Sequence, residues 1–169
     1  MKRIIFLDID GVLASIPFLS RGVGLIDPDK CRLLNQLADI DAEIVISSSW
    51  GYDDGRTEQT LRECGLTLPI TGYTNHYHES WICRGNEIEQ WLIKNCGGMG
   101  SKYGCDRSGT PYYRKHPVVD YEFVIFDDDS DFLLGQKDHF IRIDESTGIT
   151  QEDIDNAIKI LTRNGEDRD

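Results

Sequence analysis

The chain has 169 residues, of which 39% are hydrophobic and 28% are charged, and its formal net charge is −12. This length allows a single domain over residues 1–169 with a sizeable core, and the acidic balance argues against tight nonspecific binding to a nucleic-acid backbone. No apolar run is long enough to span a bilayer, and acids interrupt the first apolar stretch too early for a signal peptide. We therefore expect a cytoplasmic protein that has no membrane partner.

The first predicted element is a short buried strand over residues 4–7, which leads directly into two acids. Asp8 and Asp10 follow the strand, and Gly11 comes directly after them. Because side chains alternate along an extended backbone, the two carboxylates project to the same side. Two carboxylates close together at a buried strand end are costly unless a cation or a proton neutralises them. The pattern therefore favours a metal-dependent site over a purely structural role.

The middle of the chain alternates predicted helices and strands. A loop over residues 14–28 leads to a helix, which Asp27 is suited to cap and whose apolar spacing continues to residue 38. A second buried strand over residues 42–46 ends in three serines and Trp50. Further helices are predicted over residues 57–64 and 85–95, before a long loop excursion at about 96–117. This excursion is locally basic, so it is a candidate lid or platform and a candidate place to receive an anionic ligand.

The last part of the chain repeats the pattern of a buried strand followed by acids. A strand over residues 121–126 ends in an acidic run at 127–131, and a short strand near 140–143 precedes a helix over about 150–164 with a capping box. Uniformly apolar strands that alternate with helices predict an α/β protein. We expect a Rossmann-like three-layer sandwich with a mainly parallel sheet and no large cap domain. Ligands bind at the carboxyl ends of the strands in such sheets, so the polar strand ends should gather at one edge.

These motifs, in this order, resemble those of the haloacid dehalogenase (HAD) superfamily of phosphotransferases from residue 4 to about residue 160. That superfamily carries DxDG after its first strand, Ser or Thr after a second strand, Lys or Arg further along, and an acid cluster after a final strand. The matching residues are Asp8 to Gly11, the serines at 47–49, Arg84 or a lysine within 94–115, and the acids at 127–131. The combination of SSSW, RGNEI and FDDDSD is similar to the small capless branch of nucleic-acid-repair and polynucleotide phosphatases.

The resemblance implies a role for each acid and a magnesium ion as cofactor. Asp8 would be the nucleophile that forms an aspartyl-phosphate, and Asp10 would protonate the leaving group and then activate water. Mg²⁺ would be held by Asp8, by the backbone carbonyl of Asp10 and by one late aspartate. That late ligand is Asp128 if the motif is a strand followed by two acids. It is Asp127, supported by Asp131, if the motif is DxxxD.

The resemblance also implies residues that bind the phosphate. Ser48, or alternatively Ser47, would donate its hydroxyl to a phosphoryl oxygen. Arg84 stands at the start of a helix, where its charge and the helix N-terminus both favour an anion. Apart from the resemblance, Tyr113, Arg114 and Lys115 are candidate substrate residues, because together they are similar to a base-stacking and phosphate-binding group. Packing within the loop is the alternative role for them.

The function implied is a Mg²⁺-dependent phosphomonoester hydrolase that acts on a nucleotide or on the terminal phosphate of a nucleic acid. The partner would be a phosphorylated small molecule or a nucleic-acid end, and the sequence does not indicate an oligomeric state. Two alternatives stay open, a phosphatase of a non-nucleotide metabolite and a catalytically silent binding protein of the same fold. A receiver-like signalling module is disfavoured, because it places adjacent acids after its first strand and its phosphorylated aspartate in mid-chain.

Overall fold

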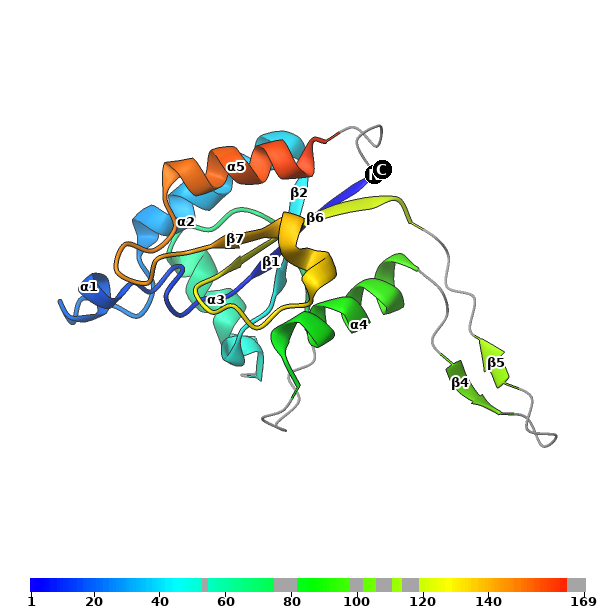
Figure 1. Cartoon of the computed structure of the whole chain (residues 1–169). Coiled ribbons are helices and arrows are strands. Elements are labelled where there is room, and N and C mark those ends of the chain that lie inside the picture. Colours follow the sequence, from blue (N-terminus) through cyan, green and yellow to red (C-terminus); the bar gives the residue numbers. More distant parts are fainter. Residues whose placement is uncertain (53–54, 75–81, 98–101, 106–110, 114–118, 164–169) are drawn as a thin grey trace.

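A computed structural model describes residues 1–52, 55–74, 82–97, 102–105, 111–113 and 119–163 of the chain. Its centre is a five-stranded sheet in the order β3-β2-β1-β6-β7, and every neighbouring pair in it is parallel (Figure 1). The strands are β1 (Lys2–Leu7), β2 (Ala42–Ile46), β3 (Ile70–Tyr73), β6 (Tyr121–Asp127) and β7 (Phe140–Arg142). The predicted α/β fold with a mainly parallel sheet is confirmed.

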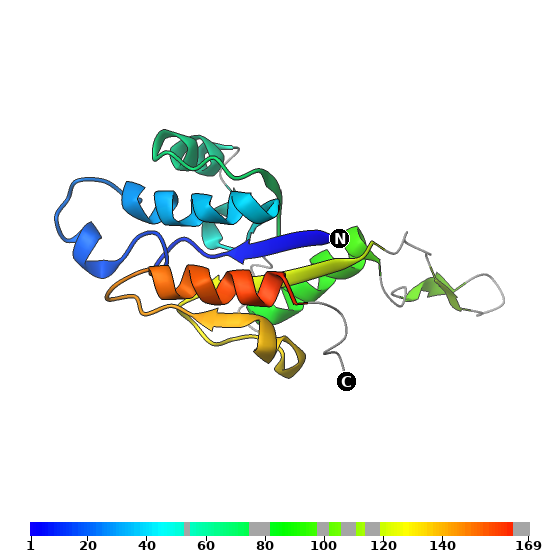
Figure 2. The ribbon, with the colours of Figure 1, turned by 90° about the horizontal axis from the view of Figure 1, so that it is seen from above.

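The central strand β1 separates two cores, because its successive side chains face opposite sides of the sheet. Ile5 and Leu7 pack in the larger core together with α2 (Pro28–Leu34), α3 (Arg56–Glu63) and α5 (Gln151–Leu161). Ile4 and Phe6 pack in the smaller core against α4 (Arg84–Cys96) on the other face. Figures 1 and 2 show α2 and α5 on one side of the sheet, and Figure 1 shows α4 on the other. The three-layer sandwich is thus confirmed, and no large cap domain is present among the residues that the structure describes.

Two helix starts have the caps that the sequence predicts. The side chain of Asp27 accepts a hydrogen bond from the backbone N–H of Asp29 at 2.9 Å, at the start of α2. At the start of α5, Thr150 and Asp153 form a reciprocal capping box. These caps satisfy backbone N–H groups that have no partner inside the helix, which explains why both helices begin where they do.

Several short elements differ from the sequence-based expectation. The loop predicted over residues 14–28 contains a one-turn helix, α1 (Ile16–Leu19), and the helix predicted to reach residue 38 gives way to the 3₁₀ helix η1 (Asn35–Ile40). The edge strand β3 was not predicted, because it is only half-buried, has four residues and includes a glycine. Two further 3₁₀ helices are η2 (Ser49–Tyr52) and η3 (Leu134–His139).

The excursion expected at 96–117 contains an antiparallel hairpin rather than only loop. Its strands are β4 (Lys102–Cys105) and β5 (Pro111–Tyr113), and they form a sheet of their own, apart from the main one (Figures 1 and 2). At the base of the excursion, the backbone N–H of Val119 donates to the carbonyl of Cys96 at 2.7 Å. Since α4 ends and β6 begins there, this base lies at the amino edge of the sheet, opposite the ends of the strands that carry acids. The role of the excursion as a lid stays a prediction.

None of the helices in the described part of the chain combines the length and the apolar content needed to cross a bilayer.

Candidate active site

The carboxyl ends of the three central strands bring three predicted site residues together. Leu7 of β1 is in register with the last apolar residues of β2 and β6, so Asp8, Ser47 and Asp127 lie next to one another at the same edge. The backbone N–H of Asp8 donates to the carbonyl of Phe126 at 3.0 Å, and that of Ser47 donates to the carbonyl of Leu7 at 2.8 Å. The side chains of all three residues are buried, so the site begins as a set of polar groups held away from water.

A cluster of three carboxylates forms at this edge. Asp8, Asp127 and Asp128 each offer one oxygen, and these oxygens all lie within 4.8 Å of one another. Asp128 rests directly against the loop of the first motif, since a Cβ added to Gly11 would lie 2.4 Å from its Cγ atom. Gly11 also has a φ of +70°, a conformation that side chains disfavour. The glycine of the DxDG motif is therefore required both by its backbone conformation and by the space that Asp128 occupies.

Arg84 provides the positive charge beside this cluster. Its Nη1 atom lies 3.9 Å from Oδ1 of Asp8, and its Nε atom lies 3.8 Å from Oδ2 of Asp127. Nη1 also donates a hydrogen bond to the backbone carbonyl of Ser47. A single guanidinium thus contacts the ends of β1, β2 and β6, and it is only 17% exposed. Among the described residues, no lysine takes this position beside the clustered acids.

Asp131 holds Arg84 in place and contributes no oxygen to the carboxylate cluster. Its Oδ2 atom accepts the backbone N–H of Arg84 at 2.9 Å, at the first residue of α4. Its carbonyl accepts the N–H of Gly85 at 3.1 Å. This anion at a helix N-terminus is a favourable arrangement. The supporting role predicted for Asp131 next to Asp127 stays a prediction, and the contact that the structure describes is with the backbone of Arg84.

Gly85, the second residue of α4, is packed too closely against its neighbours to carry a side chain. A Cβ at Gly85 would lie 2.4 Å from the backbone nitrogen of Leu133, and the buried Gln136 donates to the carbonyl of Gly85 at 2.9 Å. Sequence reasoning missed both Gly85 and Gln136 as residues that position the site. The glycine directly after Arg84 could have indicated a close contact at this position. Its partner, Gln136, lies some fifty residues later in the sequence, so only the fold shows which residue it contacts.

The two candidate serines are both buried but have different partners. The Ser48 side chain lowers the pKa of the buried Asp8 carboxyl, so its hydroxyl faces that acid. The Ser47 hydroxyl lies 3.5 Å from the hydroxyl of Thr74, and the Ser47 carbonyl accepts the bond from Arg84. Of the two hydroxyls, that of Ser48 is therefore the one that acts on the pKa of an acid in the cluster.

Burial makes two of the clustered carboxyls unusually weak acids. It raises the pKa of Asp8 to about 6, although the nearby guanidinium of Arg84 acts in the opposite direction. Burial also raises the pKa of Asp127 to about 7, with a further rise from the charge of Asp8, against the lowering effect of Arg84. One arginine does not balance the buried negative charge. A divalent cation would, and the set of hard oxygen donors fits Mg²⁺, with Asp8, Asp127 and Asp128 to hold it.

Asp10 stands outside the carboxylate cluster. Its side chain is exposed, and its Oδ2 atom accepts a hydrogen bond from the indole Nε1 of Trp50 at 3.0 Å. The predicted acid–base role of Asp10 and the predicted metal contact through its backbone carbonyl both stay predictions. Sequence reasoning did not pair Trp50 with Asp10, because their contact depends on how the loops after β1 and β2 approach each other.

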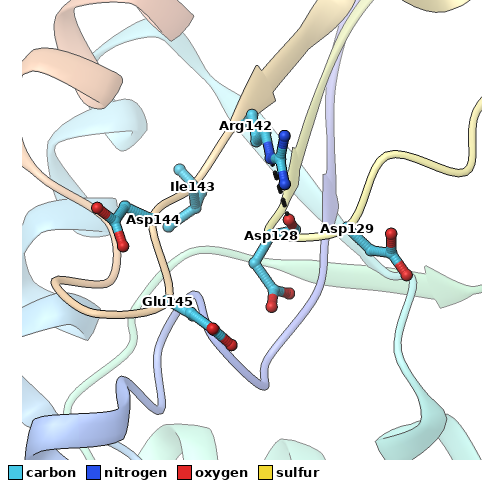
Figure 3. Close-up of a pocket in the computed structure, with 6 residues that line it drawn as sticks. All are labelled: Asp128, Asp129, Arg142, Ile143, Asp144 and Glu145. Carbon is cyan, nitrogen blue, oxygen red and sulfur yellow. Dashed lines mark hydrogen bonds between the residues drawn. The ribbon is translucent and has the colours of Figure 1, made fainter.

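An open cavity of about 580 Å³ adjoins Asp128 (Figure 3). Figure 3 shows the Asp128 side chain between the ends of β6 and β7, with Arg142 donating to its backbone carbonyl at 3.4 Å. The lining residues are Asp128, Asp129, Arg142, Ile143, Asp144 and Glu145. Four carboxylates against one guanidinium make this cavity a poor place for a second phosphate group.

The predicted substrate residues at the hairpin cannot be placed at this site. Arg114 and Lys115 lie outside the described residues, and of Tyr113 only the backbone is described.

A parallel sheet with these motifs at its carboxyl edge defines a protein of the haloacid dehalogenase class, as the order of the motifs predicts. A family model for the HAD domain in Swiss Army Knife RNA repair proteins matches residues 4–105, which is more than half of the chain. The chain belongs to this family. The match includes Asp8, Ser48 and Arg84 and ends before the acids of β6. No curated protein and no solved structure matches the chain.

The raised pKa values predict how the stability of the protein depends on pH and on Mg²⁺. Between about pH 4 and pH 7 the folded, metal-free protein holds more protons on Asp8 and Asp127 than the unfolded chain does. Its free energy of unfolding should therefore fall as the pH rises through this window. Since Mg²⁺ binds the ionised carboxylates, the rise in Tm that it causes should be larger at pH 8 than at pH 5.

Thermal unfolding in a chelator and in Mg²⁺ measures both effects. Asp127→Asn should raise the metal-free Tm at pH 8 and abolish most of the shift caused by Mg²⁺. The matched control is Asp39→Asn, which removes the same charge from an exposed position and should do neither. A metal-free Tm that increases from pH 5 to pH 8, or equal behaviour of the two variants, would contradict burial as the origin of the raised pKa values.

Proposed function

We propose that this protein is a Mg²⁺-dependent phosphomonoester hydrolase that acts through an aspartyl-phosphate on Asp8. Membership of the HAD superfamily implies hydrolase chemistry in general. The observation that carries the specific proposal is the grouping of Asp8, Asp127 and Asp128 within 4.8 Å, next to Arg84, at the carboxyl edge of the sheet. This grouping offers a nucleophile, oxygen ligands for a cation and a fixed positive charge for the phosphoryl group.

In the first step, a carboxylate oxygen of Asp8 attacks the phosphorus atom and the bond from phosphorus to the ester oxygen breaks. Asp10 gives its proton to the departing alcohol, so that no alkoxide has to form. Arg84 and the Ser48 hydroxyl bind phosphoryl oxygens, where negative charge has to be stabilised. Mg²⁺, held by Asp8, Asp127 and Asp128, supplies further charge stabilisation when bound. With a pKa of about 6, Asp8 is mostly ionised at neutral pH, as a nucleophile must be.

In the second step, water attacks the phosphorus atom of the aspartyl-phosphate. Asp10, now a carboxylate, accepts a proton from this water, the bond between Asp8 and phosphorus breaks, and inorganic phosphate leaves. Both acids are thereby returned to their starting protonation states. The two carboxyls have the same chemistry but different surroundings, since Asp8 is buried beside Arg84 and Asp10 is exposed at the rim of the site.

For the substrate, we propose a terminal phosphate of a nucleic acid. The family description names RNA repair proteins, and the site has no large cap among the described residues to exclude a bulky substrate. A mononucleotide or another small phosphomonoester is the second candidate. The observation that favours it is the acid-lined cavity beside Asp128, which disfavours the additional phosphates of a polynucleotide.

A phosphate-release screen tests this proposal. Oligonucleotides with a 3′- or 5′-phosphate should lose it in the presence of Mg²⁺, and Asp8→Asn should reduce the rate by at least about a thousandfold, because the nucleophile is lost. Mononucleotides and sugar phosphates complete the panel. Turnover that survives in Asp8→Asn, or that persists fully in a chelator, would contradict the mechanism. Release from mononucleotides but not from oligonucleotides would contradict the proposed substrate.

The partners of the two serines predict which of them binds the phosphoryl group. Ser48→Ala removes the hydroxyl that lowers the pKa of Asp8, and we expect kcat/KM to fall about a hundredfold. Ser47→Ala is the matched control, because it removes a neighbouring buried hydroxyl and keeps the carbonyl that Arg84 contacts. Its effect should be less than about tenfold. The opposite ranking of the two variants in steady-state kinetics would assign the phosphate-binding hydroxyl to Ser47.

A further inference from the structure

Trp50 is the residue of the serine loop that reaches the second acid of the DxDG motif. Its indole Nε1 donates to Oδ2 of Asp10 at 3.0 Å. Asp10 is itself exposed, so without this contact water would surround its carboxyl group. The hydrogen bond therefore joins the loop after β2 to the residue proposed as the general acid and base.

The backbone of Trp50 is fixed from both sides of the loop. The N–H of Trp50 lies 3.4 Å from the hydroxyl oxygen of Ser48, and the N–H of Gly51 donates to the carbonyl of Ser48 at 3.0 Å. The carbonyl of Trp50 accepts a hydrogen bond from the hydroxyl of Thr57, a buried residue in the first turn of α3. The half-buried Trp50 side chain packs against the larger core. The donor is thus held in place by contacts of both its backbone and its ring.

An indole N–H can only donate a hydrogen bond, and this has a consequence for the proton of Asp10. The oxygen that faces Nε1 has to be an acceptor whether the carboxyl group is charged or neutral. In the neutral acid, the carbonyl oxygen is a better acceptor than the hydroxyl oxygen, so the contact favours the proton on the other oxygen, Oδ1. We propose that Trp50 is a positioning residue that orients Asp10 so that Oδ1 is the oxygen that gives and takes the proton.

This inference rests on the proposed hydrolase function, and it adds a residue that orients a reacting group without touching the substrate. In the first step the Oδ1–H bond breaks as the ester oxygen gains the proton. In the second step Oδ1 takes a proton from the attacking water, while Oδ2 keeps its bond to the indole throughout. The carboxyl group does not have to rotate between the two steps, so the acid that donates is already oriented as the base.

The test uses Trp50→Phe, which keeps an aromatic ring and removes the N–H donor. General-acid assistance matters for an alcohol leaving group and matters little for 4-nitrophenol, which departs as a stable anion. In single-turnover measurements on the full chain with Mg²⁺, release of the alcohol from a phosphorylated nucleotide should slow about 10- to 100-fold. Release of 4-nitrophenol from 4-nitrophenyl phosphate should change less than about threefold.

The matched control is Trp91→Phe, which also removes an indole N–H. Trp91 lies on α4 and packs edge to face against Phe6 in the smaller core, away from Asp10. Both release rates should stay close to those of the unaltered protein in this variant. Equal losses for the two leaving groups in Trp50→Phe would show a general structural effect, and no loss would show that the contact does not matter. Either result would overturn the proposal.

A second measurement tests the contact without any turnover. In a ¹H–¹⁵N spectrum, the indole resonance assigned to Trp50 through Trp50→Phe should move in Asp10→Ala, while that of Trp91 should not. An unmoved Trp50 resonance would overturn the role of Trp50. Failure of the unaltered protein to hydrolyse either phosphate would instead overturn the proposed function, so the two failures are distinguishable.

Discussion

The site depends on one side chain, Arg84, that joins the ends of three strands. Its guanidinium lies beside the carboxylates of Asp8 and Asp127 and donates to the carbonyl of Ser47. Two buried carboxylates side by side would otherwise repel each other in a medium that solvates charge poorly. The arginine offsets part of that cost, and the raised pKa values of both acids show that it does not offset all of it. The remaining imbalance is what a divalent cation would correct.

The position of Arg84 in turn depends on the segment that follows the acids of β6. Asp131 accepts the backbone N–H of Arg84, and Gln136 binds the carbonyl of Gly85, so the start of α4 is fastened to the chain just beyond the acid cluster. The residues that bear the charge and the residues that hold the helix are therefore parts of one network. The hairpin leaves the sheet at the opposite edge.

The sequence was sufficient to predict the central strands and the edge at which Asp8, Ser48 and Asp127 meet. Long apolar runs identify such strands, and a parallel sheet brings their carboxyl ends together. The sequence was not sufficient to predict β3, which is a short, half-buried edge strand. It also did not predict the contact of Asp131 with Arg84 or the contact of Trp50 with Asp10. These contacts depend on how separate loops approach each other, and no local pattern of residues encodes that approach.

The proposed hydrolase mechanism requires Asp8 to carry the phosphoryl group between its two steps. Acid-quenched reactions with Mg²⁺ and a phosphomonoester substrate, reduced with borohydride and digested, would convert an aspartyl-phosphate to homoserine, which peptide mass spectrometry locates. We expect homoserine at position 8, absent without Mg²⁺ and absent from Asp8→Asn. Homoserine at another aspartate, or none at position 8 under conditions in which phosphate is released, would contradict the assignment of Asp8 as the nucleophile.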